Sequence, residues 1–166
     1  NFLSTDRFTH KIERKQGEKL VSLRDILVPV RRRIDRNDLP PDTKYIQRDD
    51  LRNLPNQHEL HASRLSSLLS DSIHHTLYVI DETCILSRFR GNFTQFIWFK
   101  YDVPDGKIAL PPVIDAYKLI HPDIDYAYLL HQFQEEYMVR QLKEIKRFRF
   151  YKEEFLNIQL KVPSEI

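Results

Sequence analysis

The segment from Cys84 to Tyr101, CILSRFRGNFTQFIWFKY, gathers hydrogen-bonding side chains between two apolar runs. Arg88, Arg90 and Asn92 surround Gly91, one of only three glycines in the chain. Glycine adopts backbone conformations with positive φ that other residues resist, so this position predicts a tight turn or bulge between two strands. Such a turn would direct the polar side chains outward together. This display suits a charged or hydrogen-bonding ligand, and a solvated hairpin tip would have the same composition.

Two further stretches concentrate positive charge, although the formal net charge of the chain is only +2. RRRIDR (31–36) carries four arginines against Asp35, and KEIKRFRFYK (143–152) carries five basic residues against Glu144. The second stretch interleaves aromatic residues with its charges, a pattern that fits a surface contacting phosphates. Runs of charge are also common on solvated faces, so both interpretations stay open.

The residue types that perform catalysis or hold metals form no recognised pattern. Four histidines lie between residues 58 and 75, but they complete no zinc signature and are interpreted as surface or helix-cap residues. Cys84 lies in an apolar run and is predicted to be a buried structural thiol. Phosphate-cradling glycine loops, nucleophile elbows and dinucleotide fingerprints are missing from the sequence. We therefore expect no catalytic residue, metal or cofactor, and the missing active site favours a binding module.

Length and composition predict one folded domain. With 166 residues, 41% of them hydrophobic, the chain is long enough for one core and too short for two ordinary domains. A single cysteine excludes a disulfide within the chain and favours a reducing, cytoplasmic compartment. The sequence has no run of about twenty apolar residues, which excludes a spanning helix. The chain opens on Asn1 instead of methionine, and we expect the natural protein to be longer.

The elements that would position these residues mix helices and strands. Residues 1–19 are polar and are expected to form an N-terminal extension, and the folded domain is expected to cover 20–166. Ser22 is predicted to cap a short helix that Pro29 limits. Apolar spacings predict a helix from Leu60 to Ile73 and one long helix from Asp123 or Asp125 to Ile145. Strands are predicted at 44–47, 93–101, 108–110, 113–120 and 158–162, and two short strands are predicted within 76–87, around Asp81 and Glu82. The fold class predicted is α+β, a single mixed domain with one main sheet packed by helices.

Five segments follow one another in an order that is more specific than any one of them. They are LVSLRDILVPVRRRI, KYIQRDDL, YVIDETCILSRFRG, IDYAYLLHQFQ and FLNIQLKVPSEI. This order, covering residues 20–166, resembles the DNA target recognition domain of type I restriction-modification specificity subunits. The residues that fit the family's pattern are Leu23, Asp25, Ile26, Tyr45, Ile46, Asp50, Leu51, Asp81, Ile85, Leu86, Ser87, Tyr128, Leu129, Phe155, Ile158, Leu160 and Pro163. The chain departs from the pattern at KRFRFYKEEF, where members usually carry a glycine-containing segment.

The resemblance implies sequence-specific binding of double-stranded DNA by the specificity component of a bacterial, cytoplasmic restriction system. It implies no chemistry in this chain. Methyl transfer and cleavage would belong to separate modification (methyltransferase) and restriction subunits. S-adenosylmethionine, Mg and ATP would be the cofactors of those partner subunits.

The hydrogen-bonding chemistry of the side chains then predicts which residues would contact DNA. An arginine fork can meet guanine O6 and N7 together, and an Asn or Gln amide can meet adenine. The base-reading candidates are Arg88, Arg90, Asn92 and Gln95. The phosphate candidates are Arg31, Arg32, Arg33, Lys146, Arg147 and Arg149. The alternative is a protein-interaction module without intrinsic DNA specificity, in which Phe96, Trp98 and the long helix form a partner surface.

Overall fold

The protein is described by a computed structural model over residues 12, 14–47, 59–60, 65–67, 76–90, 95–101, 107–145 and 151–163. The chain divides into two compact units. The first unit comprises Asn1–Val28, Phe89–Phe96 and Leu119–Ile166, and the second comprises Pro29–Arg88 and Ile97–Lys118. Helices and packed sheets confirm the α+β class. The described strands form three sheets, where one main sheet was expected.

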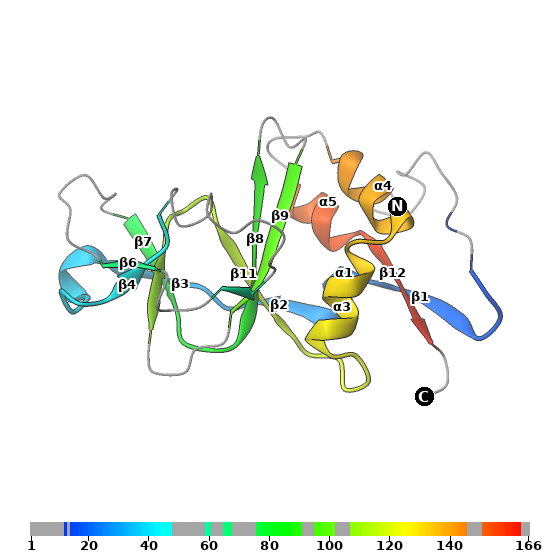
Figure 1. Ribbon diagram of the computed structural model, residues 1–166, viewed down its shortest axis with the longest axis horizontal. Helices are drawn as coiled ribbons and strands as arrows, with labels where there is room; N and C mark the ends of the chain where they lie inside the picture. The colour runs from blue at the N-terminus through cyan, green and yellow to red at the C-terminus, as the bar shows by residue number, and fades with distance from the viewer. Residues whose placement is uncertain are drawn as a thin grey trace. The chain divides into compact units, whose positions relative to one another are not determined.

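The first unit packs helices on a two-stranded sheet. Strand β1 (Glu18–Ser22) pairs antiparallel with β12 (Gln159–Pro163), and the two lie side by side as the blue and red strands of Figure 1. The helices are α1 (Leu23–Ile26), α3 (Tyr126–Gln132), α4 (Glu136–Lys143) and α5 (Tyr151–Leu156). The buried residues of this unit include Leu23, Ile26, Leu129, Phe133, Met138, Leu142, Phe155, Ile158 and Leu160. β1 begins at Glu18, two residues before the expected domain boundary.

Ser22 occupies the N-cap position of α1, as predicted, but its hydroxyl makes no capping hydrogen bond. The Ser22 Oγ instead accepts a hydrogen bond of 2.7 Å from Nε2 of Gln159. The residue therefore joins α1 to β12, a contact between residues far apart in the sequence.

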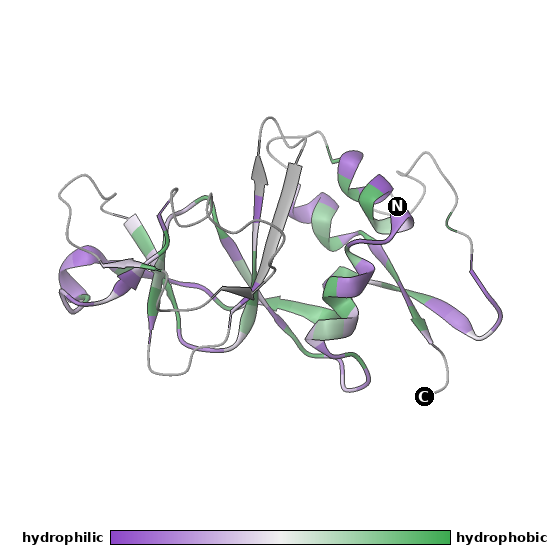
Figure 2. Ribbon diagram, viewed as in Figure 1, coloured by the Kyte–Doolittle hydropathy of each residue, from purple (hydrophilic) through white to green (hydrophobic). Residues whose placement is uncertain are grey.

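The prediction of one long helix up to Ile145 is wrong, because the chain forms two separate helices, α3 and α4, in this region. Asp125 caps α3 through a hydrogen bond from the backbone N–H of Tyr128 to its carboxylate. The helix ends at Phe133, and Glu135 is extended (φ −72°, ψ 147°) before α4 begins. α4 carries hydrophilic and hydrophobic residues in alternating bands along its turns (Figure 2).

The other described strands form two sheets of five strands each. One has the order β3 (Arg32–Asp35), β7 (Thr76–Ile80), β10 (Ile108–Leu110), β4 (Lys44–Tyr45) and β6 (Ser66–Ser67). The other has the order β2 (Leu27–Pro29), β11 (Asp115–Leu119), β8 (Cys84–Arg90), β9 (Gln95–Tyr101) and β5 (Glu59–Leu60). A short 3₁₀ helix, η2 (Arg36–Asp38), follows β3.

Strands β7 and β10 are buried on both faces. Tyr78, Ile80, Ile108 and Leu110 belong to a cluster that also holds Cys84, Leu86, Tyr101 and Ala116 from the other sheet. Leu77, Val79 and Ala109 point to the opposite face, into a second cluster with Leu39 and Tyr45. Successive strand residues face opposite sides, so a run without polar residues such as Ile108–Leu110 fits a strand covered on both faces.

The helix predicted from Leu60 to Ile73 is wrong where the structure describes it. Leu60 lies in β5, and Ser66 and Ser67 form β6, which pairs antiparallel with β4. The apolar residues of this segment have mixed helical spacings, and pairing with strands elsewhere in the sequence outweighs such a weak helical pattern. Leu65, directly before β6, is buried and is not helical. The remainder of the segment lies outside the described residues, as do the four histidines between 58 and 75.

Candidate nucleic-acid interface

Arg31, the first of the three phosphate candidates at 31–33, is engaged inside the second unit. Its Nη1 donates to the carbonyl oxygens of Pro112 (2.9 Å) and Ile114 (2.8 Å). Its Nη2 lies 3.3 Å from Oδ1 of Asp115, and the side chains of the two residues are 13% and 9% exposed. The guanidinium carbon lies 3.9 Å from the centre of the Tyr78 ring. The Arg31 fork is therefore occupied by protein groups, which favours a structural role.

Arg32 and Arg33 are both exposed on β3, the edge strand of its sheet. Arg32 forms an exposed ion pair of 2.9 Å with Asp81, in the turn between β7 and β8. Arg33 lies directly across from Tyr78 on β7. Within the described part of the chain, the Arg33 side chain makes no hydrogen bond or ion pair. Charged residues on an edge strand also prevent pairing with other sheets, so this placement fits both a phosphate surface and edge protection.

The base-reading candidates lie in or between two neighbouring strands. Arg88 and Arg90 belong to β8, Gln95 begins β9, and β8 and β9 are adjacent in their sheet. This confirms the strands predicted on either side of Gly91. Arg88 is half-buried, and its Nε atom is buried. Asn92 lies outside the described residues.

The second basic stretch is described only at its ends. Lys146, Arg147 and Arg149 lie outside the described residues. Lys143 is exposed at the end of α4, and Tyr151 begins α5, with the Lys152 ammonium 5.9 Å from the centre of its ring. The three phosphate candidates of this stretch stay a prediction.

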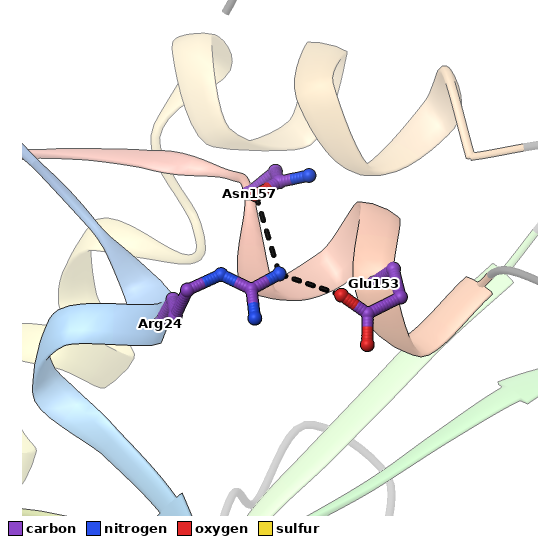
Figure 3. A network of polar contacts seen from close by, with 3 residues as sticks. All are labelled: Arg24, Glu153 and Asn157. Atoms are coloured by element: carbon purple, nitrogen blue, oxygen red, sulfur yellow. Dashed lines mark hydrogen bonds and ion pairs between the residues drawn. The ribbon is translucent and has the colours of Figure 1, made fainter. Parts of the chain in front are cut away.

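Arg24 is an exposed cation that is not among the DNA-contact candidates predicted from the sequence. Figure 3 shows its guanidinium between two residues of the α5 region. Its Nη2 lies 2.6 Å from Oε2 of Glu153 and donates to Oδ1 of Asn157 at 3.5 Å. The contact joins α1 to α5 across the sequence, and the carboxylate of Glu153 neutralises the charge. No local pattern in the sequence links Arg24 to Glu153, so only the fold could identify this pair.

Among the residues that the structure describes, the titratable groups with shifted pKa values are tyrosines. Burial raises the pKa of Tyr101 to about 12, and repulsion from Cys84 adds to the shift. Burial also raises the pKa values of Tyr45, Tyr128 and Tyr137. Cys84 is buried, as predicted. Among the residues that the structure places, no three His, Cys, Asp or Glu side chains gather as metal ligands, and no helix is long and apolar enough to cross a membrane.

No family model and no curated protein matches the chain. Its fold is similar to that of a protein whose crystal structure has been solved, with a TM-score of 0.55. That structure is described as the HsdS subunit from Thermoanaerobacter tengcongensis. The likeness covers 98% of this chain and 37% of the other, at 11% sequence identity. At this identity the likeness concerns the fold alone, and the chain spans well under half the length of the HsdS subunit.

Proposed function

We propose that this chain is a DNA target recognition domain of a type I restriction-modification specificity subunit. The observation that carries the proposal is the likeness in fold to an HsdS subunit over 98% of the chain. The order of five sequence segments suggests the same family independently of the structure. In this role the chain binds double-stranded DNA at a specific sequence and directs partner modification and restriction subunits to it.

The proposed phosphate contacts are Arg32, Arg33, Lys146, Arg147 and Arg149. Arg32 and Arg33 support this assignment because both are exposed on one edge strand. Phosphate contacts set the affinity and the register of a protein on DNA without reporting the sequence. We assign Arg31 a structural role, because two carbonyl groups, a carboxylate and an aromatic ring occupy its guanidinium.

The proposed base contacts are Arg88, Arg90, Asn92 and Gln95, around the connection between β8 and β9. Connections between strands that a packed sheet supports are common places for binding residues. In this proposal the chain performs no catalysis, and S-adenosylmethionine, Mg and ATP are bound by the partner subunits.

Selection from a pool of randomised duplexes at low salt tests the function. We expect the chain to enrich a short motif and a double Arg32→Gln, Arg33→Gln variant to bind the enriched duplex more weakly. Both side chains are exposed, so this variant should fold normally. Binding without enrichment would contradict sequence-specific recognition. No binding to any duplex would favour a protein-interaction module.

A further inference from the structure

The turn between β10 and β11, residues Pro111 to Ile114, is held more firmly than an ordinary surface turn. The backbone N–H of Ile114 donates to the carbonyl of Pro111 at 3.2 Å, which closes the turn. Pro111 and Pro112 fix two φ angles. The Arg31 guanidinium adds hydrogen bonds to the carbonyls of Pro112 and Ile114. The turn is therefore rigid for reasons of both sequence and packing.

Arg31 holds the turn in place, and burying its charged guanidinium costs free energy because the group loses contact with water. Its side chain is only 13% exposed, and it lies against Asp115 and the ring of Tyr78. A buried ion pair of this kind contributes little net stability, because desolvation offsets most of the attraction between the charges. What the arrangement does supply is a fixed conformation for the turn that Arg31 binds.

The tip of this rigid turn is apolar and exposed. Val113 is 53% exposed, and with Ile120 at 50% it is one of two exposed large hydrophobic side chains among the described residues. Arg33 lies across β3 and β7 from Tyr78, the residue that Arg31 covers. The turn and Arg33 are thus linked through two residues, because Arg31 binds the turn and lies against Tyr78, and Tyr78 is the residue across from Arg33.

We infer that Val113 and Arg33 form a contact surface for duplex DNA, with Arg31 as the positioning residue of the turn. The charge of Arg33 suits a phosphate. The apolar group that a duplex presents in its major groove is the C5 methyl of thymine, and a valine side chain at a fixed position can recognise it. The inference rests on the proposed function and adds a specificity-determining residue to it.

Uracil substitution tests the contact, because uracil lacks only the C5 methyl of thymine. Each thymine of the enriched duplex is replaced by uracil in turn, and affinities are measured for the unmodified chain and for Val113→Ser. One uracil position should weaken binding by the unmodified chain about threefold to fivefold, the effect of losing one buried methyl group. Val113→Ser should bind the thymine duplex correspondingly more weakly and should no longer distinguish thymine from uracil at that position.

Matched variants separate this contact from general effects. Ile120→Ser removes an equally exposed apolar side chain and should keep the sensitivity to uracil. Arg33→Gln should weaken binding to all duplexes, and the slope of log affinity against log salt should become shallower by the amount expected for about one phosphate contact. Lys143→Gln makes the same change in charge and should have a smaller effect on both the affinity and the slope. Arg31→Lys keeps the charge but loses the fork, so it should reduce the discrimination of uracil.

Two results would overturn the inference. One is the lack of any uracil-sensitive position in the enriched duplex, and the other is full uracil sensitivity in Val113→Ser. Either result would leave the proposed function intact as long as the unmodified chain enriches a motif. Failure of the unmodified chain to enrich any motif would overturn the proposed function and this inference together.

Discussion

Three consecutive arginines show what a sequence can and cannot predict at the scale of single residues. Strand alternation places Arg32 on the opposite face from Arg31 and Arg33. The sequence does not indicate that Arg31 meets carbonyl groups 81 and 83 residues away, because those contacts depend on the packing of β3 beside the turn after β10. Of three chemically identical candidates, one is therefore internal and two are exposed.

Arg31 and Arg33 should differ sharply in their effects on stability. Arg31→Met removes one charged partner of a nearly buried carboxylate, Asp115, together with two hydrogen bonds to carbonyl groups, and should lower the free energy of unfolding by about 3 kcal/mol. Arg33→Gln changes an exposed side chain and should alter it by less than about 0.5 kcal/mol. Urea unfolding followed by circular dichroism measures both. Equal losses in the two variants would contradict the structural role of Arg31.

The raised pKa of Tyr101 predicts a loss of stability at high pH. The pKa rises from an ordinary value of 10.0 to about 12 in the folded chain, so the folded state holds the phenol proton more tightly than the unfolded state. The contribution is fully present below about pH 10 and is lost as the pH rises toward 12. It amounts to about 2 to 3 kcal/mol, because each pKa unit corresponds to about 1.4 kcal/mol.

Tyr101→Phe provides the control for this pH dependence. The difference in unfolding free energy between the unmodified chain and the variant should be constant from pH 7 to about pH 9 and should change between about pH 10 and pH 12. A difference that stays constant over the whole range would contradict the assignment. The other buried tyrosines titrate equally in both proteins and cancel in the comparison.

At the scale of elements, the edge of β12 that faces away from β1 is closed by side chains. Gln141 of α4 donates to the carbonyl of Gln159 at 2.9 Å and accepts from its N–H at 2.8 Å. The N–H of Lys161 donates to the Tyr137 hydroxyl at 3.0 Å, and the Lys161 carbonyl accepts from the Tyr128 hydroxyl at 2.5 Å. Three side chains thus satisfy backbone groups that would otherwise need another strand.

Removing this closure should destabilise the chain. Gln141 is fully buried, and Gln141→Leu would leave one backbone N–H and one carbonyl of Gln159 without partners. We expect a loss of about 2 to 4 kcal/mol, since each unsatisfied buried group costs about 1 to 3 kcal/mol. Arg140→Gln, which breaks only an exposed pair with Glu136 on the same helix, should cost less than about 0.5 kcal/mol. Thermal unfolding of the two variants measures the contrast, and similar losses would argue against the closure.

The break between α3 and α4 could have been found in the sequence. The buried residues Leu129 and Phe133 are four apart, as are Met138 and Leu142, but Phe133 and Met138 are five apart. Five residues advance a helix well past one turn, so one continuous helix could not bury both pairs on the same face. The strands β5 and β6 carry no comparable signal, because each has two residues and depends on its partner strand.

At the scale of the whole molecule, the residues that suggested the family are mainly core residues. Leu23, Ile46, Leu86, Leu129 and Ile158 are all essentially inaccessible to solvent. Such residues specify how the elements pack, and they therefore predicted the fold class well. Residues that contact a ligand lie on connections and edges, where packing does not restrict their identity, and the sequence could nominate them only by chemical type.

Two exposed carboxylates in the turn after β7 allow a charge-matched test of Arg32. Asp81 pairs with Arg32 and Glu82 pairs with Lys118, at 2.9 Å and 3.0 Å. If Arg32 contacts a phosphate, Asp81→Asn frees it and should strengthen binding to any duplex at low salt by about twofold to fivefold. Glu82→Gln makes the same change in net charge and should have a smaller effect. Fluorescence anisotropy measures both, and equal gains would show that only net charge matters.

In the proposed function the chain holds DNA by several phosphates and recognises its sequence through separate contacts. The most direct measurement is the affinity for the enriched duplex and for a scrambled duplex over a salt series. Five phosphate contacts predict a slope of log affinity against log salt of about −4.5 for both duplexes, with the enriched duplex bound at least about tenfold more tightly throughout. A slope near zero would contradict binding through phosphates, and equal affinity for the two duplexes would contradict sequence-specific recognition.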